Sequence, residues 1–167
     1  MIASALALAL LALAACGFEP VYGRGSTVRH AELAAIDVAP IDSLAGLALR
    51  NQLIPTLGSN RGESRYQLNI ALEEQQGEFA IQSNAEVTRY KLALSASFTL
   101  TDLATGETVY SGATRSVGSY NVVQSEFATV ASENDARKRA AQDLADNIRE
   151  LLIVHFSRET PTAQTTP

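Results

Sequence analysis

An alternating pattern in the middle of the chain constrains the fold more than any other feature of the sequence. From Val87 to Thr101, apolar residues occupy every second position, with polar or small residues between them. The apolar set is Tyr90, Leu92, Leu94, Ala96, Phe98 and Leu100. Successive side chains of a strand point to opposite faces, so this period predicts a long β-strand with one core face and one polar face. The rest of the chain has to cover the core face.

Two further strands are predicted, one before it and one after it in the sequence. Residues 66–72 alternate in the same way, and residues 75–77 predict a bulge or bend after them. Gly106 marks a hairpin loop that leads into a strand from about Thr108 to Val117. The two faces of that strand are too alike to show which one is buried. Residues 118–130 predict a looser segment.

A helix is predicted before the strand over residues 66–72. Asp42 or Ser43 can cap its N-terminus, and Gly58 ends it. Its apolar stripe is expected to consist of Leu44, Leu47, Ala48, Asn51, Ile54 and Leu57. Because Pro55 removes one backbone hydrogen bond, we expect this helix to fray or bend near Leu53.

A second, longer helix is predicted from Ser132, which has capping-box spacing with Asp135, to about His155. Its apolar stripe is expected to consist of Ala140, Leu144, Ile148, Leu151, Leu152 and His155. The opposite side is expected to carry Arg137, Lys138, Arg139, Asp143, Asp146 and Glu150. Some twenty helical residues reach roughly 30 Å, which is long enough to cross the sheet.

The order of these elements predicts the fold class. A short strand over residues 34–38 precedes the first helix, which gives strand, helix, three strands, helix. This order predicts an α+β fold, a two-layer α/β sandwich with two helices packed on one face of a four-stranded, mostly antiparallel sheet. We expect one domain over residues 31–157 and a disordered tail over residues 158–167. The sheet face without helices is where function is expected.

The N-terminal segment has the pattern expected of an export and anchoring signal. Residues 1–15 are apolar and uncharged, and they end in small residues directly before Cys16. This pattern resembles the lipobox of bacterial lipoproteins, which implies removal of residues 1–15 and attachment of diacylglycerol and an N-acyl chain to Cys16. Gly17 stands where inner-membrane retention requires Asp, so the resemblance implies the outer membrane. The alternative is a buried helix with Cys16 as a core thiol.

Two further expectations concern the residues around the anchor. Residues 16–30 are predicted to be a tether between the lipid and the domain. Signal peptides begin with a basic segment, and Met1 to Ser4 has none, so we expect the true translation start to lie upstream.

Composition excludes several classes of function. The net charge is −5 and the basic residues are scattered, so nucleic acid is not an expected partner. A single cysteine excludes an intramolecular disulfide, and two histidines without close spacing predict no metal site and no cofactor beyond the acyl chains. No nucleophile elbow or phosphate-binding loop is present, so we expect no enzyme; a small lipid-anchored hydrolase is the weakest alternative.

Three features together resemble one family. They are Cys-Gly-Phe-Glu-Pro-Val-Tyr-Gly from Cys16, the order of strands and helices, and the stretch from Tyr120 to Ala141. In combination they are similar to the LptE family of lipopolysaccharide-assembly lipoproteins, closest to its alphaproteobacterial branch, over Cys16 to about Phe156. The resemblance implies a non-enzymatic subunit of the outer-membrane lipopolysaccharide translocon, seated inside the LptD β-barrel.

The same resemblance suggests a lipopolysaccharide contact. Phosphates favour Arg and Lys, so Arg89 and Lys91 on the predicted outward face are candidates, with Arg115 as a third. The alternative is that these are solvated charges that keep the sheet soluble. Whether the chain handles lipopolysaccharide or only assists barrel assembly stays open. So does a different function, that of a periplasmic auxiliary lipoprotein of an ABC-type lipid transporter.

Overall fold

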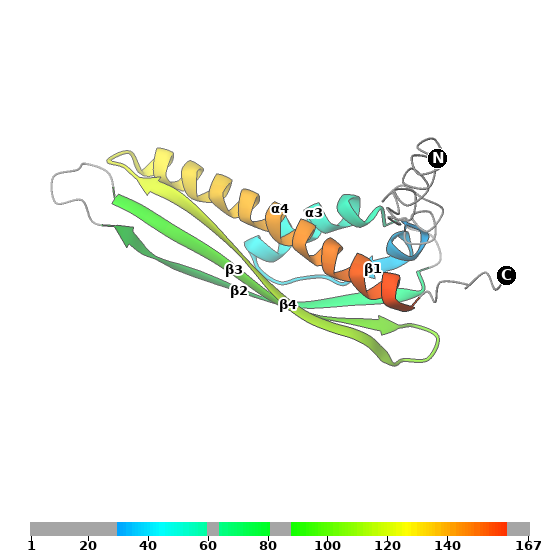
Figure 1. The fold of residues 1–167 in the computed structure, drawn as a ribbon. Coiled ribbons are helices and arrows are strands. Elements are labelled where there is room, and N and C mark those ends of the chain that lie inside the picture. The colour runs from blue at the N-terminus through cyan, green and yellow to red at the C-terminus, as the bar shows by residue number, and fades with distance from the viewer. Residues whose placement is uncertain (1–29, 60–63, 81–87, 160–167) are drawn as a thin grey trace, which may run out of the picture.

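The computed structural model describes residues 30–59, 64–80 and 88–159, which form two layers (Figure 1). One layer is a twisted sheet, and the other consists of two helices on a single face of that sheet. The elements are β1 (Ile36–Val38), α3 (Leu44–Leu57), β2 (Tyr66–Ala80), β3 (Thr88–Asp102), β4 (Thr108–Val122) and α4 (Glu126–Glu159). A further helical turn covers residues 30–34.

The sheet has the strand order β1-β2-β3-β4. Strands β2, β3 and β4 form an antiparallel meander, whereas β1 lies parallel to β2 with Ile36 opposite Tyr66. The expected α+β two-layer sandwich is confirmed, but the sheet is mixed rather than mostly antiparallel. A parallel pair needs a crossover connection, and α3 provides it between β1 and β2.

The alternation in β3 was interpreted correctly. Leu92, Leu94 and Leu100 are fully buried under the helices, and their neighbours in sequence point to the other face. In β2, Tyr66 and Leu68 extend the same core. The bulge predicted over residues 75–77 is wrong, because the register of β2 against β3 shifts between Glu78 and Ala80 instead.

Strand β4 is longer than predicted, since it continues through the supposedly loose residues 118–122. Its inward face, which the sequence left open, carries the small residues Gly112, Thr114, Ser116 and Gly118 between Tyr110 and Tyr120. These small residues let α4 lie close to the strand. A Cβ atom on Gly118 would stand 3.1 Å from the carbonyl oxygen of Ala136.

Helix α3 has the predicted ends but not the predicted face. The Ser43 hydroxyl accepts a hydrogen bond from the Gly46 amide at 3.1 Å, and Gly58 ends the helix at a φ of 69°. The helix does not fray near Leu53, because Pro55 falls in the last turn and the helix continues to Leu57. The buried residues are Ala45, Gly46, Leu49, Leu53 and Leu57, whereas Leu44 is 73% and Leu47 55% exposed.

Helix α4 begins earlier than predicted. Ser125, not Ser132, stands before its first turn, and its hydroxyl accepts a hydrogen bond from the Ala128 amide at 3.4 Å. With 34 residues, α4 is about 51 Å long. Its buried stripe is Ala136, Ala140, Ala141, Leu144, Ala145, Ile148, Leu152 and Phe156. The helix includes Arg158 and Glu159, two residues of the predicted tail; residues 160–167 lie outside the described part.

Candidate functional site

The face of the sheet that α3 and α4 leave uncovered, here called the open face, is the candidate site (Figure 1). The register places its side chains in rows that cross β2, β3 and β4. In order toward the β2–β3 end, five of these rows are Asn69–Thr99–Ser111, Ala71–Ser97–Ala113, Glu73–Ser95–Arg115, Gln75–Ala93–Val117 and Gly77–Lys91–Ser119. The first two of these rows are uncharged, and the charged side chains of Glu73, Arg115 and Lys91 follow farther along the strands.

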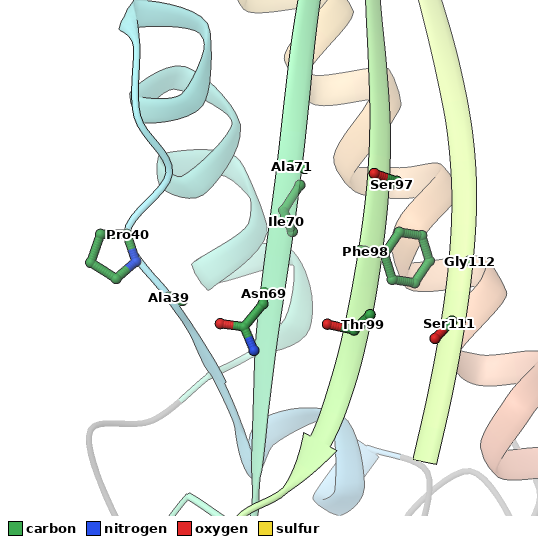
Figure 2. A pocket seen from close by; sticks show the side chains of 10 residues that line it. All are labelled: Ala39, Pro40, Asn69, Ile70, Ala71, Ser97, Phe98, Thr99, Ser111 and Gly112. Carbon is green, nitrogen blue, oxygen red and sulfur yellow. The ribbon is translucent and has the colours of Figure 1, made fainter. Parts of the chain in front are cut away.

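Two hollows lie on the open face. The first has a volume of about 480 Å³, and Figure 2 shows the amide of Asn69 and the hydroxyls of Thr99 and Ser111 around it, with Pro40 at its side. The second, of about 690 Å³, is lined by Glu73, Ser95 and Arg115 among others. Ala71 and Ser97 line both, so the two hollows meet along the strands.

The small row Ala71–Ser97–Ala113 explains why the sheet is hollowed here. No side chain in this row extends beyond a hydroxyl group. A surface of this kind offers backbone and hydroxyl groups to a partner at close range, without long side chains that would have to be ordered.

The basic residues predicted from sequence all lie on the open face, but they do not form one cluster. Arg89 and Lys91 are two residues apart on β3, which is about 7 Å along a strand. Arg115 pairs with Ser95, four residues from Lys91, which is about 13 Å farther along β3. Arg115 therefore stands apart from the other two. Cys16 lies outside the described residues.

Sequence reasoning missed a charged cluster on the other side of the sheet, beneath the first half of α4. Arg137, predicted on the solvent side of the helix, faces the sheet, and its side chain is 11% exposed. Its Nε and Nη2 atoms donate to the two carboxylate oxygens of Glu74, each at 2.9 Å. Nη2 also donates to Glu133 at 2.5 Å, and Nη1 donates to Asn134 at 2.7 Å.

The cluster continues through Gln76. The Gln76 amide donates to Glu74 and Glu133, and the Tyr120 hydroxyl donates to the Gln76 carbonyl oxygen at 3.0 Å. Hydrogen bonds from Arg137 hold the pKa of Glu74 below its usual range, and the same contacts raise the pKa of Arg137. Because it joins β2, β4 and α4, this cluster fixes the position of α4 over the sheet.

A signal for this cluster was present in the sequence. Glu74 and Gln76 continue the inward alternation of Tyr66, Leu68, Ile70 and Leu72, so they had to face the core. A carboxylate on that face requires a cation, and Glu133 and Arg137 have the i, i+4 spacing of a helical pair. Glu73, the preceding residue, lies on the open face, so the two adjacent glutamates are on opposite faces of the sheet.

Within the described ranges, no group of three or more His, Cys, Asp or Glu side chains is placed to hold a metal ion. The same residues contain no helix with both the length and the apolar character that a membrane crossing requires.

Comparison with known proteins identifies the family. A family model for LptE, lipopolysaccharide-assembly, matches residues 33–152. The chain belongs to the LptE lipopolysaccharide-assembly family. The resemblance found in the sequence is confirmed, and this LptE-family chain is a lipopolysaccharide-assembly lipoprotein of the cell envelope.

The chain is also similar to solved structures. The crystal structure of a predicted lipoprotein from Caulobacter crescentus CB15 has a TM-score of 0.71 and 25% identity to this LptE-family chain, and the match covers 80% of this chain and 98% of that one. A minor lipoprotein from Acinetobacter baumannii has a TM-score of 0.49 and 20% identity, over 72% of this chain and 90% of that one. No curated protein matches the chain.

Proposed function

We propose that this chain is the lipid-anchored subunit of an outer-membrane lipopolysaccharide translocon and that its open face docks inside an LptD-type β-barrel. The observation that carries the proposal is the hollowed centre of the open face, where the small residues Ala71, Ser97 and Ala113 lie between rows that carry hydroxyl, amide and charged groups. Interiors of large outer-membrane barrels are polar. A face of hydroxyls, amides and small side chains is compatible with the polar interior wall of a barrel, whereas a large apolar face would not be.

Attachment through Cys16 fits this placement. The anchor and the first described residue, His30, are separated by a segment that spans at most about 50 Å when fully extended. Acyl chains on Cys16 would hold the domain at the inner leaflet of the outer membrane, because two or more chains make attachment stable.

Lipopolysaccharide is the second proposed ligand. Arg89 and Lys91 lie on one face at a spacing that lets both reach the same phosphate group. Arg115 shares its hollow with Glu73, whose negative charge opposes a phosphate. The phosphate proposal therefore rests on Arg89 and Lys91.

The test is copurification from outer membranes in mild detergent, followed by a high-salt wash. Salt screens exposed ion pairs but leaves a packed interface in place. We expect one large barrel to remain bound to the wild-type chain. Ser97→Arg, which fills the centre of the hollows, should abolish this, whereas Gln142→Arg on the exposed side of α4 should not. Recovery of the wild-type chain alone, or with inner-membrane transporter components, would refute the proposal.

Two variants test the anchor and the lipid contact separately. Cys16→Ala should release a folded chain from membranes of cells that lack the barrel; retention there would contradict the anchor. Arg89→Glu combined with Lys91→Glu should weaken binding of fluorescent lipopolysaccharide without changing the melting temperature. Unchanged binding would remove both residues from the proposal.

A further inference from the structure

We propose that the row Glu73–Ser95–Arg115 binds a segment of the barrel by charge complementarity. In the docked complex, a basic side chain of that segment lies over Glu73 and an acidic side chain lies over Arg115. This inference rests on the proposed docking of the open face. It assigns Arg115 to the contact with the protein partner rather than to lipopolysaccharide.

The geometry of the row defines the contact. Ser95 pairs with Glu73 on one side and with Arg115 on the other, so all three side chains point to the open face. Two strand spacings separate Glu73 from Arg115, which is about 10 Å between their Cα atoms. The serine between them is short, so the second hollow lies open between two opposite charges.

Both charges are available to a partner. Glu73 and Arg115 are exposed, and the described part of the chain contains no ion pair or hydrogen bond to either side chain. This distinguishes them from Glu74 and Arg137, which form an ion pair directly beneath the sheet.

Docking would change the energetics of this row. Water now solvates both charges, but a barrel wall over the hollow would exclude water and leave each charge without compensation. The wall must then bring opposite charges at matching positions, or docking is opposed. A partner with this pattern fits in only one orientation, so the row also fixes the register of the docked segment.

The mixed charge of the hollow argues against a lipid headgroup at this position. A phosphate that approaches Arg115 meets the Glu73 carboxylate across the same hollow. A protein segment carries both signs at fixed spacing and satisfies both residues. The volume of about 690 Å³ is large enough for side chains of such a segment.

The experiment compares the full lipidated chain with Glu73→Arg, Arg115→Glu and the double reversal, each coexpressed with the barrel and washed in high salt. Glu73→Gln and Arg115→Gln serve as milder versions if a reversal lowers expression. The matched control reverses two exposed charges on α4, Lys138→Glu with Asp146→Arg. Each single reversal should lower the barrel-to-lipoprotein ratio by at least about tenfold, because an unpaired charge in a desolvated contact opposes association.

The double reversal separates two explanations. If the partner reads both charges, the double variant should bind no better than either single variant. If Glu73 and Arg115 only balance each other, the double variant should recover wild-type binding, which would overturn the inference. Equal retention by all charge variants would also overturn it while leaving barrel docking intact, whereas loss of the barrel by the wild-type chain would refute docking itself.

A photo-crosslinking residue at Ser95 gives a direct readout. A crosslinked barrel peptide that contains both an acidic and a basic residue supports the inference. Crosslinks to lipopolysaccharide at this position would refute it.

Discussion

Replacing Arg137 with alanine should destabilise the protein more than the same replacement of any other charged residue on α4. The substitution removes two hydrogen bonds to Glu74 and one each to Glu133 and Asn134. It leaves the carboxylates of Glu74 on β2 and Glu133 on α4 without the cation that lies between them. Leaving a charge without its partner in a partly buried site is one of the few mechanisms by which a single substitution causes a large loss of stability.

The magnitude follows from the exposure of the residues in the cluster. Removing one partner of a fully buried ion pair costs about 3–5 kcal/mol, while an exposed pair contributes at most about 1 kcal/mol. The side chains of Glu74 and Glu133 keep 22% and 27% of their surface exposed, so water recovers part of the loss. We expect the free energy of unfolding to fall by about 2–3 kcal/mol at neutral pH, between these two limits.

The effect should depend on pH in a defined direction. The pKa of Glu74 is lowered in the folded protein, mainly by hydrogen bonds from Arg137. A lowered carboxylate pKa contributes stability above its unfolded value, about 4.3, and this contribution is lost as the pH falls through the folded value. The difference between wild type and Arg137→Ala should therefore be complete at neutral pH and shrink below about pH 4.

Urea unfolding followed by far-ultraviolet circular dichroism measures this difference, since the chain contains no tryptophan. Arg139→Ala is the matched control. Within the described residues Arg139 forms one ion pair, an exposed i, i+4 pair with Asp135, so its removal should cost no more than about 0.5 kcal/mol. An equal loss for the two variants, or a loss at Arg137 that is the same in acid as at neutral pH, would refute the reasoning.

Three further predictions concern packing and capping, each measured by thermal or urea unfolding. Leu94→Asp places a charge at a fully buried position and should cost several kcal/mol; an unchanged melting temperature would mean that the faces of β3 are reversed. Gly112→Ala should cost about 1–3 kcal/mol, because its Cβ atom would lie 2.6 Å from the Phe98 ring; wild-type stability would contradict this packing. Ser43→Ala removes the cap on the Gly46 amide and should cost about 1 kcal/mol, with Ser43→Asp close to wild type.

The sequence predicted the sheet well because β3 has a single interpretation. Its alternation between Leu92 and Leu100 leaves one face apolar, so the strand, its core face and the need for covering helices all follow. The location of the open face could be predicted for the same reason. Its rows could not, because they depend on the register between strands, which sets Ser95 between Glu73 and Arg115.

The errors arose where local sequence fitted more than one structure. Helix α3 carries leucines all round, so its periodicity could not distinguish Leu49 and Leu53 from the exposed Leu44. Residues 118–122 look like a loop because Gly118 has no side chain to pack, yet the close approach of α4 requires that glycine. Arg137 was placed in solvent because a charge on an amphipathic helix usually lies there.

The parallel pairing of β1 has a consequence for the order in which the fold is completed. Strands β2, β3 and β4 and helix α4 follow one another along the chain and can associate as each is completed. β1 comes before all of them in the chain, and α3 packs against it, but its partner strand arrives only with Tyr66 and the residues after it. Until then Ile36 and Val38, both buried in the finished fold, lack the strand that completes their environment, so the first strand of the domain stays exposed to wrong pairing longer than the other three.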